Sequence, residues 1–150
     1  MSLYLLLKLV HIGAAMVAVG ANVSYAFWLR HAGLDRDQLV HTLEGVHRLD
    51  MWLANPAYVI VLLTGIGMVA FGPYPIGTPW ILAAIGLYVL IAVVGITLYA
   101  PAVRRQRAEA LADPSSAAYR AAARRSNLLG LLAIGIVAVI VFLMVVKPTF

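Results

Sequence analysis

Residues 128–146 read LLGLLAIGIVAVIVFLMVV, an apolar run without one charged, amide or hydroxyl side chain. A helix rises about 1.5 Å per residue, so a run of this length reaches across the roughly 30 Å hydrocarbon core of a bilayer. The apolar residues follow one another instead of alternating with polar ones, which excludes a strand of a membrane β-barrel. The run therefore predicts a transmembrane helix.

Three other stretches have the same character. With Asn127 added to the run above, the predicted spans are residues 3–29, 51–71, 80–100 and 127–146. Hydrophobic residues make up 63% of the 150 residues and charged residues 11%, far from the balance of a soluble domain. No basic residue precedes the first span, which favours an uncleaved helix over a signal peptide. The predicted fold class is an all-α membrane protein, one domain (1–150) built as a four-transmembrane-helix bundle.

The basic residues predict the orientation of this bundle. Of the eleven lysines and arginines, all but Lys8 and Lys147 lie between the first and second spans or between the third and fourth. Basic residues are retained on the cytoplasmic side, so we expect both termini on the non-cytoplasmic side. The arginines lack interleaved aromatic residues, which favours lipid headgroups as their partners and excludes nucleic acid.

The segment before the second span has a helical pattern of its own. Leu39, Leu43, Val46 and Leu49 recur at helical spacing among charged residues, which predicts an amphipathic cytoplasmic helix over residues 34–50. Within the spans glycine and alanine are frequent, and these small residues allow close helix packing. They also favour self-association into a homo-oligomer.

His11 is the one residue with ionisable chemistry that lies clearly inside a predicted span. Lys8, one turn nearer the outer surface, is long enough to reach the headgroups. The residues that share a helix face with His11 are small or polar, namely Ala14, Ala15, Ala18 and Asn22. This face leaves room for another helix or for a planar ligand. Two interpretations therefore stay open, a structural histidine hydrogen-bonded to a neighbouring helix and a ligand of a bound cofactor.

Met68 and Met144 fall at roughly the depth of His11 when residues are counted from the inner ends of the spans. Imidazole and thioether groups are the axial ligands of many haems, and they also bind copper(I). Lys8 and Lys147 are each three residues from one of these ligands, where haem propionates would need partners. The predicted cofactor site combines these five residues with Asn22, and its metal is haem iron or, alternatively, copper. Cysteine is absent, so iron–sulfur clusters are excluded.

Several segments resemble known membrane proteins. The opening LKLVHIGAAMVAVG (7–20) resembles the first helix of the superfamily that contains copper-resistance protein D and the HemJ-type protoporphyrinogen oxidase. Later motifs are similar to a four-helix family of bacterial predicted integral membrane proteins, and they are NPAYVIVLLTGIGMV (55–69), TPWILAAIGLYV (78–89) and YAPAVRRQ (99–106). The resemblance extends to about residue 110 and implies a multi-pass protein of the bacterial inner membrane.

The resemblance also implies roles for individual residues. In the HemJ branch the first-helix histidine is a haem b ligand opposite a methionine, which implies this role for His11 with Met68 or Met144. That branch has a lysine soon after the tryptophan of helix three, whereas Trp80 is followed by ILAAI, so porphyrinogen oxidation is not implied. The copper-resistance branch would imply copper movement, but its methionine-rich outer loops are missing here.

The leading hypothesis is an integral membrane haem b-binding protein with a redox or electron-transfer role. A single haem in one leaflet cannot carry electrons across the membrane alone, so a quinone or a redox protein would be its partner. The alternative is a non-catalytic membrane subunit or small transporter component, copper-linked or without any cofactor. All six acidic residues lie in the predicted cytoplasmic segments, which disfavours a proton-coupled transporter.

Overall fold

The computed structural model describes residues 2–33 and 35–148 of the chain, and these residues are helical almost throughout. The α-helices are α1 (Leu3–His31), α2 (Arg36–Leu49), α3 (Asn55–Phe71), α4 (Pro79–Val94), α5 (Ala100–Ala112) and α6 (Ala117–Val146). Two π-helical turns, η1 (Asp50–Ala54) and η2 (Gly95–Tyr99), join α2 to α3 and α4 to α5 without a break.

Four continuous helices result from these joins, and each is long and apolar enough to cross a membrane. They are Leu3–His31, Arg36–Phe71, Pro79–Ala112 and Ala117–Val146. The predicted set of four transmembrane helices is thereby confirmed, and each predicted span lies inside one of them. The orientation of the termini relative to the cytoplasm stays a prediction.

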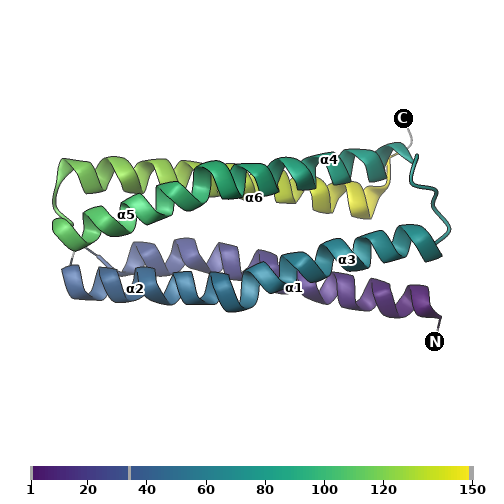
Figure 1. Ribbon diagram of the computed structural model, residues 1–150, viewed down its shortest axis with the longest axis horizontal. Coiled ribbons are helices and arrows are strands. Elements are labelled where there is room, and N and C mark those ends of the chain that lie inside the picture. The colour runs from purple at the N-terminus through teal and green to yellow at the C-terminus, as the bar shows by residue number, and fades with distance from the viewer. Residues whose placement is uncertain (1, 34, 149–150) are drawn as a thin grey trace.

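The helices form two hairpins, which Figure 1 shows as two layers along the long axis of the molecule. One hairpin pairs α1 with the α2–α3 helix, and the other pairs the α4–α5 helix with α6. Both chain ends lie at the same end of the bundle, together with the connection between α3 and α4. We call this the terminal end, and we call the opposite end, with the arginine-rich connections, the arginine end.

Side-chain oxygens cap the starts of several helices. The Ser2 hydroxyl accepts a hydrogen bond from the backbone N–H of Leu5, and the Ser116 hydroxyl accepts one from that of Tyr119. In the turn before α6, Asp113 accepts hydrogen bonds from the hydroxyl and the backbone N–H of Ser115, and these bonds lower the pKa of its carboxyl group. Each of these helices thus begins directly after a short polar residue whose side-chain oxygen accepts a hydrogen bond from the first turn.

A proline follows each π-helical turn closely. Pro56 is the second residue of α3 and Pro101 the second of α5. Proline lacks an N–H donor, and its ring clashes with the carbonyl group four residues earlier in a regular helix. A π turn widens the helix, with the N–H of Asn55 bonded to the carbonyl of Asp50 and that of Ala100 to Gly95. The wide turns therefore let both helices pass a proline without ending.

Little of the apolar surface of the spans is buried inside the chain. Between 6% and 17% of the residues in the most apolar window of each spanning helix are buried. Two compact clusters account for much of the core, one at the arginine end around Leu39, Leu43 and Tyr119, and one at the terminal end around Trp80 and Leu143. The apolar side chains that face outward belong in lipid, as expected for a membrane-spanning bundle.

Candidate functional site around His11

His11 lies in the interface between α1 and α3, with one ring nitrogen bonded across it. Its Nδ1 is 3.0 Å from the hydroxyl oxygen of Thr64. The Thr64 hydroxyl itself donates to the backbone carbonyl of Ile60, at 2.6 Å, and lies 3.2 Å from that of Val61. Because the single hydroxyl hydrogen is directed at these carbonyls, we assign the bond to His11 as Nδ1–H donating to Thr64. The other ring nitrogen, Nε2, then carries a lone pair.

Glycines of α3 provide the space that this interface needs. A Cβ added at Gly65 would lie 3.3 Å from Cε1 of His11, and one added at Gly67 would lie 3.1 Å from Cδ1 of Leu7. At Gly72, the first residue after α3, an added Cβ would lie 2.7 Å from the Tyr4 ring. The side chains of α1 thus pack directly onto the backbone of α3. The flat surface that receives His11 belongs to α3, and the alanines on its own helix do not form it.

The two methionines proposed as partners of His11 lie in different surroundings. Met68 follows Thr64 by four residues on α3, so both lie on one face of that helix, one turn apart. Met144 lies on α6 and packs against the terminal-end cluster of Trp80 and Leu143. The structure thus brings Met68 close in register to the His11–Thr64 pair and places Met144 against the α4–α6 hairpin.

The predicted lysines differ in their contacts. Lys8 is exposed on α1, toward the terminal end from His11. Lys147 caps α6 in a left-handed conformation with φ of 51°. Its ammonium group donates to the hydroxyl of Tyr74 at 3.3 Å and lies 4.8 Å from the centre of that ring. Lys147 is therefore already engaged by an aromatic side chain, whereas Lys8 is exposed.

Asn22 belongs to a second polar group, nearer the arginine end. It follows His11 by eleven residues, which is about 16 Å along α1. Its amide donates to the hydroxyl of Tyr58 and to the carbonyl of Ala18, both at 2.8 Å. The hydroxyl of Tyr88 donates to the carbonyl of Tyr58 at 2.9 Å, so this group links α1, α3 and α4.

Thr64, Tyr58 and Tyr88 were not predicted as polar partners within the bundle. A signal was present, because each is a hydroxyl-bearing residue in an otherwise apolar span, and such a group needs a hydrogen-bond partner away from water. Tyr25 departs from this rule, because its buried hydroxyl has no hydrogen-bond partner among residues 2–33 and 35–148. A hydroxyl group in an apolar span thus predicts a hydrogen bond within the bundle.

The family model described as "Predicted integral membrane protein (DUF2269)" matches residues 5–148, nearly the whole chain. The chain belongs to this family. The resemblance to predicted integral membrane proteins is thereby confirmed, and it extends well beyond residue 110. No curated protein and no solved structure matched the chain.

The capacity of this DUF2269 chain to bind a metal rests on few residues. Within the described ranges no three side chains of histidine, cysteine or acid type come together as a metal cluster. A cavity of about 290 Å³ lies between α1 and α6. It is lined by Val19, Asn22, Ile134, Val137, Ala138 and Val141. His11 is not part of this lining, so a bound haem would need contacts other than this cavity.

Proposed function

We propose that this DUF2269 member is a haem b-binding protein of the bacterial inner membrane with a redox or electron-transfer role. In this proposal Nε2 of His11 would hold the haem iron. One observation carries the proposal, namely the bond from Nδ1–H of His11 to Thr64. Histidines that bind metals through one nitrogen commonly donate the other N–H to a neighbouring acceptor, which holds the ring in one tautomer and orientation.

Beside His11, the thioether of Met68 would hold the iron in preference to that of Met144. Met68 lies one turn from Thr64, whereas Met144 packs against Trp80 and Leu143. Lys8 is exposed and available to pair with a propionate, whereas Lys147 already contacts Tyr74. A bound haem would supply reversible one-electron chemistry. The chain itself would hold the iron through His11, orient the ring through Thr64 and supply positive charge from Lys8.

The orientation that the arginines predict would place His11 in the outer half of the membrane. Electrons would then reach or leave this site through a quinone dissolved in the bilayer or through a redox protein at the outer surface. An oxidoreductase activity would follow if such a partner were the substrate.

A second candidate has an observation of its own. The Nδ1–Thr64 bond and the close contact with Gly65 are also what a structural tie between two membrane helices requires. Under this reading the chain is a non-catalytic membrane subunit or a small transporter component, copper-linked or without a cofactor. Its glycine-rich surfaces would serve helix association, including a homo-oligomer.

Absorption spectroscopy separates the two candidates. The full-length protein, expressed with ample haem and purified in detergent, should show a Soret band, and His11→Ala should lose most of it. His41→Ala is the matched control, because His41 is an exposed histidine of α2, far from His11 along the chain, and its loss should leave the band unchanged. A colourless wild-type protein, or a Soret band that survives in His11→Ala, would reject haem ligation by His11. Copper found by elemental analysis in a colourless preparation would support the copper-linked form of the second candidate.

A further inference from the structure

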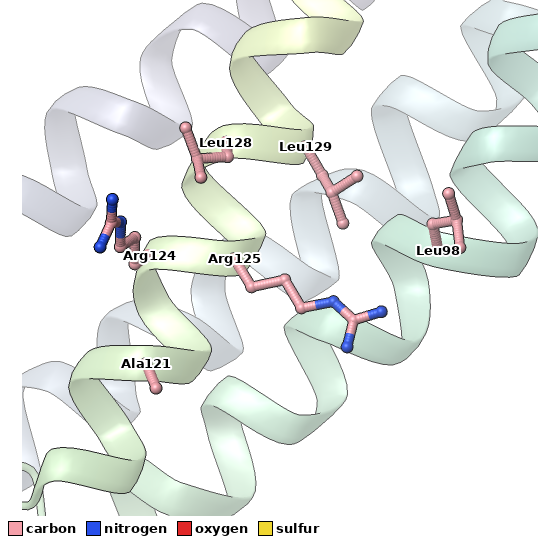
Figure 2. A pocket seen from close by; sticks show the side chains of 6 residues that line it. All are labelled: Leu98, Ala121, Arg124, Arg125, Leu128 and Leu129. Carbon is pink, nitrogen blue, oxygen red and sulfur yellow. The ribbon is translucent and has the colours of Figure 1, made fainter.

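A groove lies between α6 and the η2 turn of the third spanning helix, in the half of the bundle nearer the arginine end. Its volume is about 460 Å³, within the range of ligand pockets. It is lined by Leu98, Ala121, Arg124, Arg125, Leu128 and Leu129. Figure 2 shows the side chain of Arg125 extending from α6 toward the helix that carries Leu98, while Arg124 leaves α6 in the opposite direction. The groove therefore combines an apolar wall with two guanidinium groups.

The position of the groove along α6 matches the boundary between headgroups and hydrocarbon. Arg124 and Arg125 come just before the apolar run of residues 128–146, and Leu128 and Leu129 are the first residues of that run. Charged groups are costly in the hydrocarbon and favourable at its edge. The two arginines therefore lie at headgroup level, and the leucines extend from there into the acyl-chain region.

Neither arginine has a partner within residues 2–33 and 35–148. Some other arginines at this end are engaged, since Arg107 donates to the Glu44 carboxylate at 2.6 Å and Arg105 lies 3.8 Å from that of Glu109. No hydrogen bond or ion pair of this kind involves Arg124 or Arg125. Guanidinium groups bind phosphate oxygens in bidentate geometry, and phosphate is the anion that a membrane supplies at this depth.

We propose that this groove binds one anionic phospholipid of the phosphatidylglycerol type. The lipid phosphate contacts Arg125, which extends toward the helix that carries Leu98, and Arg124 adds positive charge at the opposite edge of the groove. One acyl chain lies along Leu98, Leu128 and Leu129. Retention of positive charge on one side of the membrane explains why arginines occur in this connection. Charge retention does not explain why two unpaired arginines lie beside an apolar groove. A bound lipid explains the arginines and the groove together. Basic pockets between membrane helices are known settings for such headgroups.

Native mass spectrometry of the full-length protein in detergent tests the proposal. The protein is titrated with phosphatidylglycerol or with phosphatidylcholine that has the same acyl chains. We expect retention of one phosphatidylglycerol molecule in preference to phosphatidylcholine. The double variant Arg124→Gln/Arg125→Gln should bind it roughly twenty-five-fold more weakly, at about fivefold for each arginine. Its circular dichroism should match the wild type, which separates a lost site from a lost fold.

Two further variants sharpen the test. Arg104→Gln is the charge control, because Arg104 is exposed on α5 and lies outside the groove, and it should bind phosphatidylglycerol as the wild type does. Leu98→Trp fills the groove without changing charge and should also weaken binding. Equal retention of the two lipids, or wild-type binding by the folded double variant, would overturn the proposal. Displacement of the lipid by millimolar glycerol phosphate alone would overturn the role of the apolar wall.

Discussion

The two helical hairpins differ in the contacts that hold their own helices together. In the first hairpin α1 lies directly on the glycines of α3, and His11 reaches Thr64 across the contact. In the second, bulky side chains around Trp80 fill the space between α4 and α6 at the terminal end. Near the arginine end of that hairpin, the Ser126 hydroxyl donates to the side chain of Gln106.

This difference shows where a membrane bundle can hold a functional side chain. Lipid tails are as apolar as leucine, so burying apolar groups does not by itself bring membrane helices together. Close approach over small residues and polar contacts drive association instead. The first hairpin combines both, and its glycines leave room for an imidazole ring. The candidate site lies there for this reason.

The largest destabilisation of the first hairpin is expected from a side chain that fills the space beside His11. Gly65→Leu should destabilise the protein by about 1–3 kcal/mol, because a Cβ at this position already lies 3.3 Å from the ring and a longer side chain would separate the helices. Thermal unfolding in detergent measures the loss. Gly86→Leu is the control, since a Cβ there meets nothing within 4 Å. Equal destabilisation by both variants would show that close packing at Gly65 is unimportant.

A smaller effect is expected from the polar contact itself. Thr64→Val keeps the shape of the side chain but removes the acceptor for Nδ1–H of His11, which should cost about 1 kcal/mol in the free energy of unfolding. Thr97→Val is matched to it, because Thr97 is exposed and its hydroxyl donates only to the carbonyl of Val93 on its own helix. If Thr97→Val is as harmful as Thr64→Val, the bond to His11 contributes nothing of its own.

The smallest effect should come from a bond that joins the hairpins to each other. Tyr88→Phe removes the donor to the Tyr58 carbonyl, which should cost about 0.6 kcal/mol and widen the separation between hairpins. The chain has no cysteine, so spin labels at Val19→Cys and Ala138→Cys can report that separation. Tyr4→Phe is the control. An unchanged distance distribution in Tyr88→Phe would mean that other contacts hold the hairpins in place.

The spans could be predicted from the sequence because the cost of unpaired polar groups in hydrocarbon leaves few alternatives. Continuity through Pro56 and Pro101 was harder to predict. A proline in a helix pattern can end the helix, kink it or be accommodated by a wide turn, and packing against the neighbouring helices decides among these outcomes. The sequence shows both prolines, but it does not show those neighbours.

For the candidate site, the sequence indicated the depth of each residue but not its neighbours around the bundle. His11 stood out because histidine in a span is unusual. Counting residues put Met68 and Met144 at a similar height, yet only packing decides that one lies on the α3 face of Thr64 and the other against Trp80. Thr64 was not predicted as the hydrogen-bond partner of His11, because threonine is common in membrane helices. Its importance depends on which side chain lies opposite.

Each π-helical turn changes which side of a long helix faces the neighbouring helices. Each turn contains one residue more than a regular helix would use over the same path, which rotates everything beyond it by about 100°. The residues before the turn and those after it therefore face different sides of the bundle, although they belong to one continuous helix. Arg36–Phe71 can direct Leu39 and Leu43 toward one partner and Thr64 toward another. A deletion of one residue in η1 would remove this rotation. Leu39 and Leu43 could then no longer keep their contacts while Thr64 keeps its bond to His11.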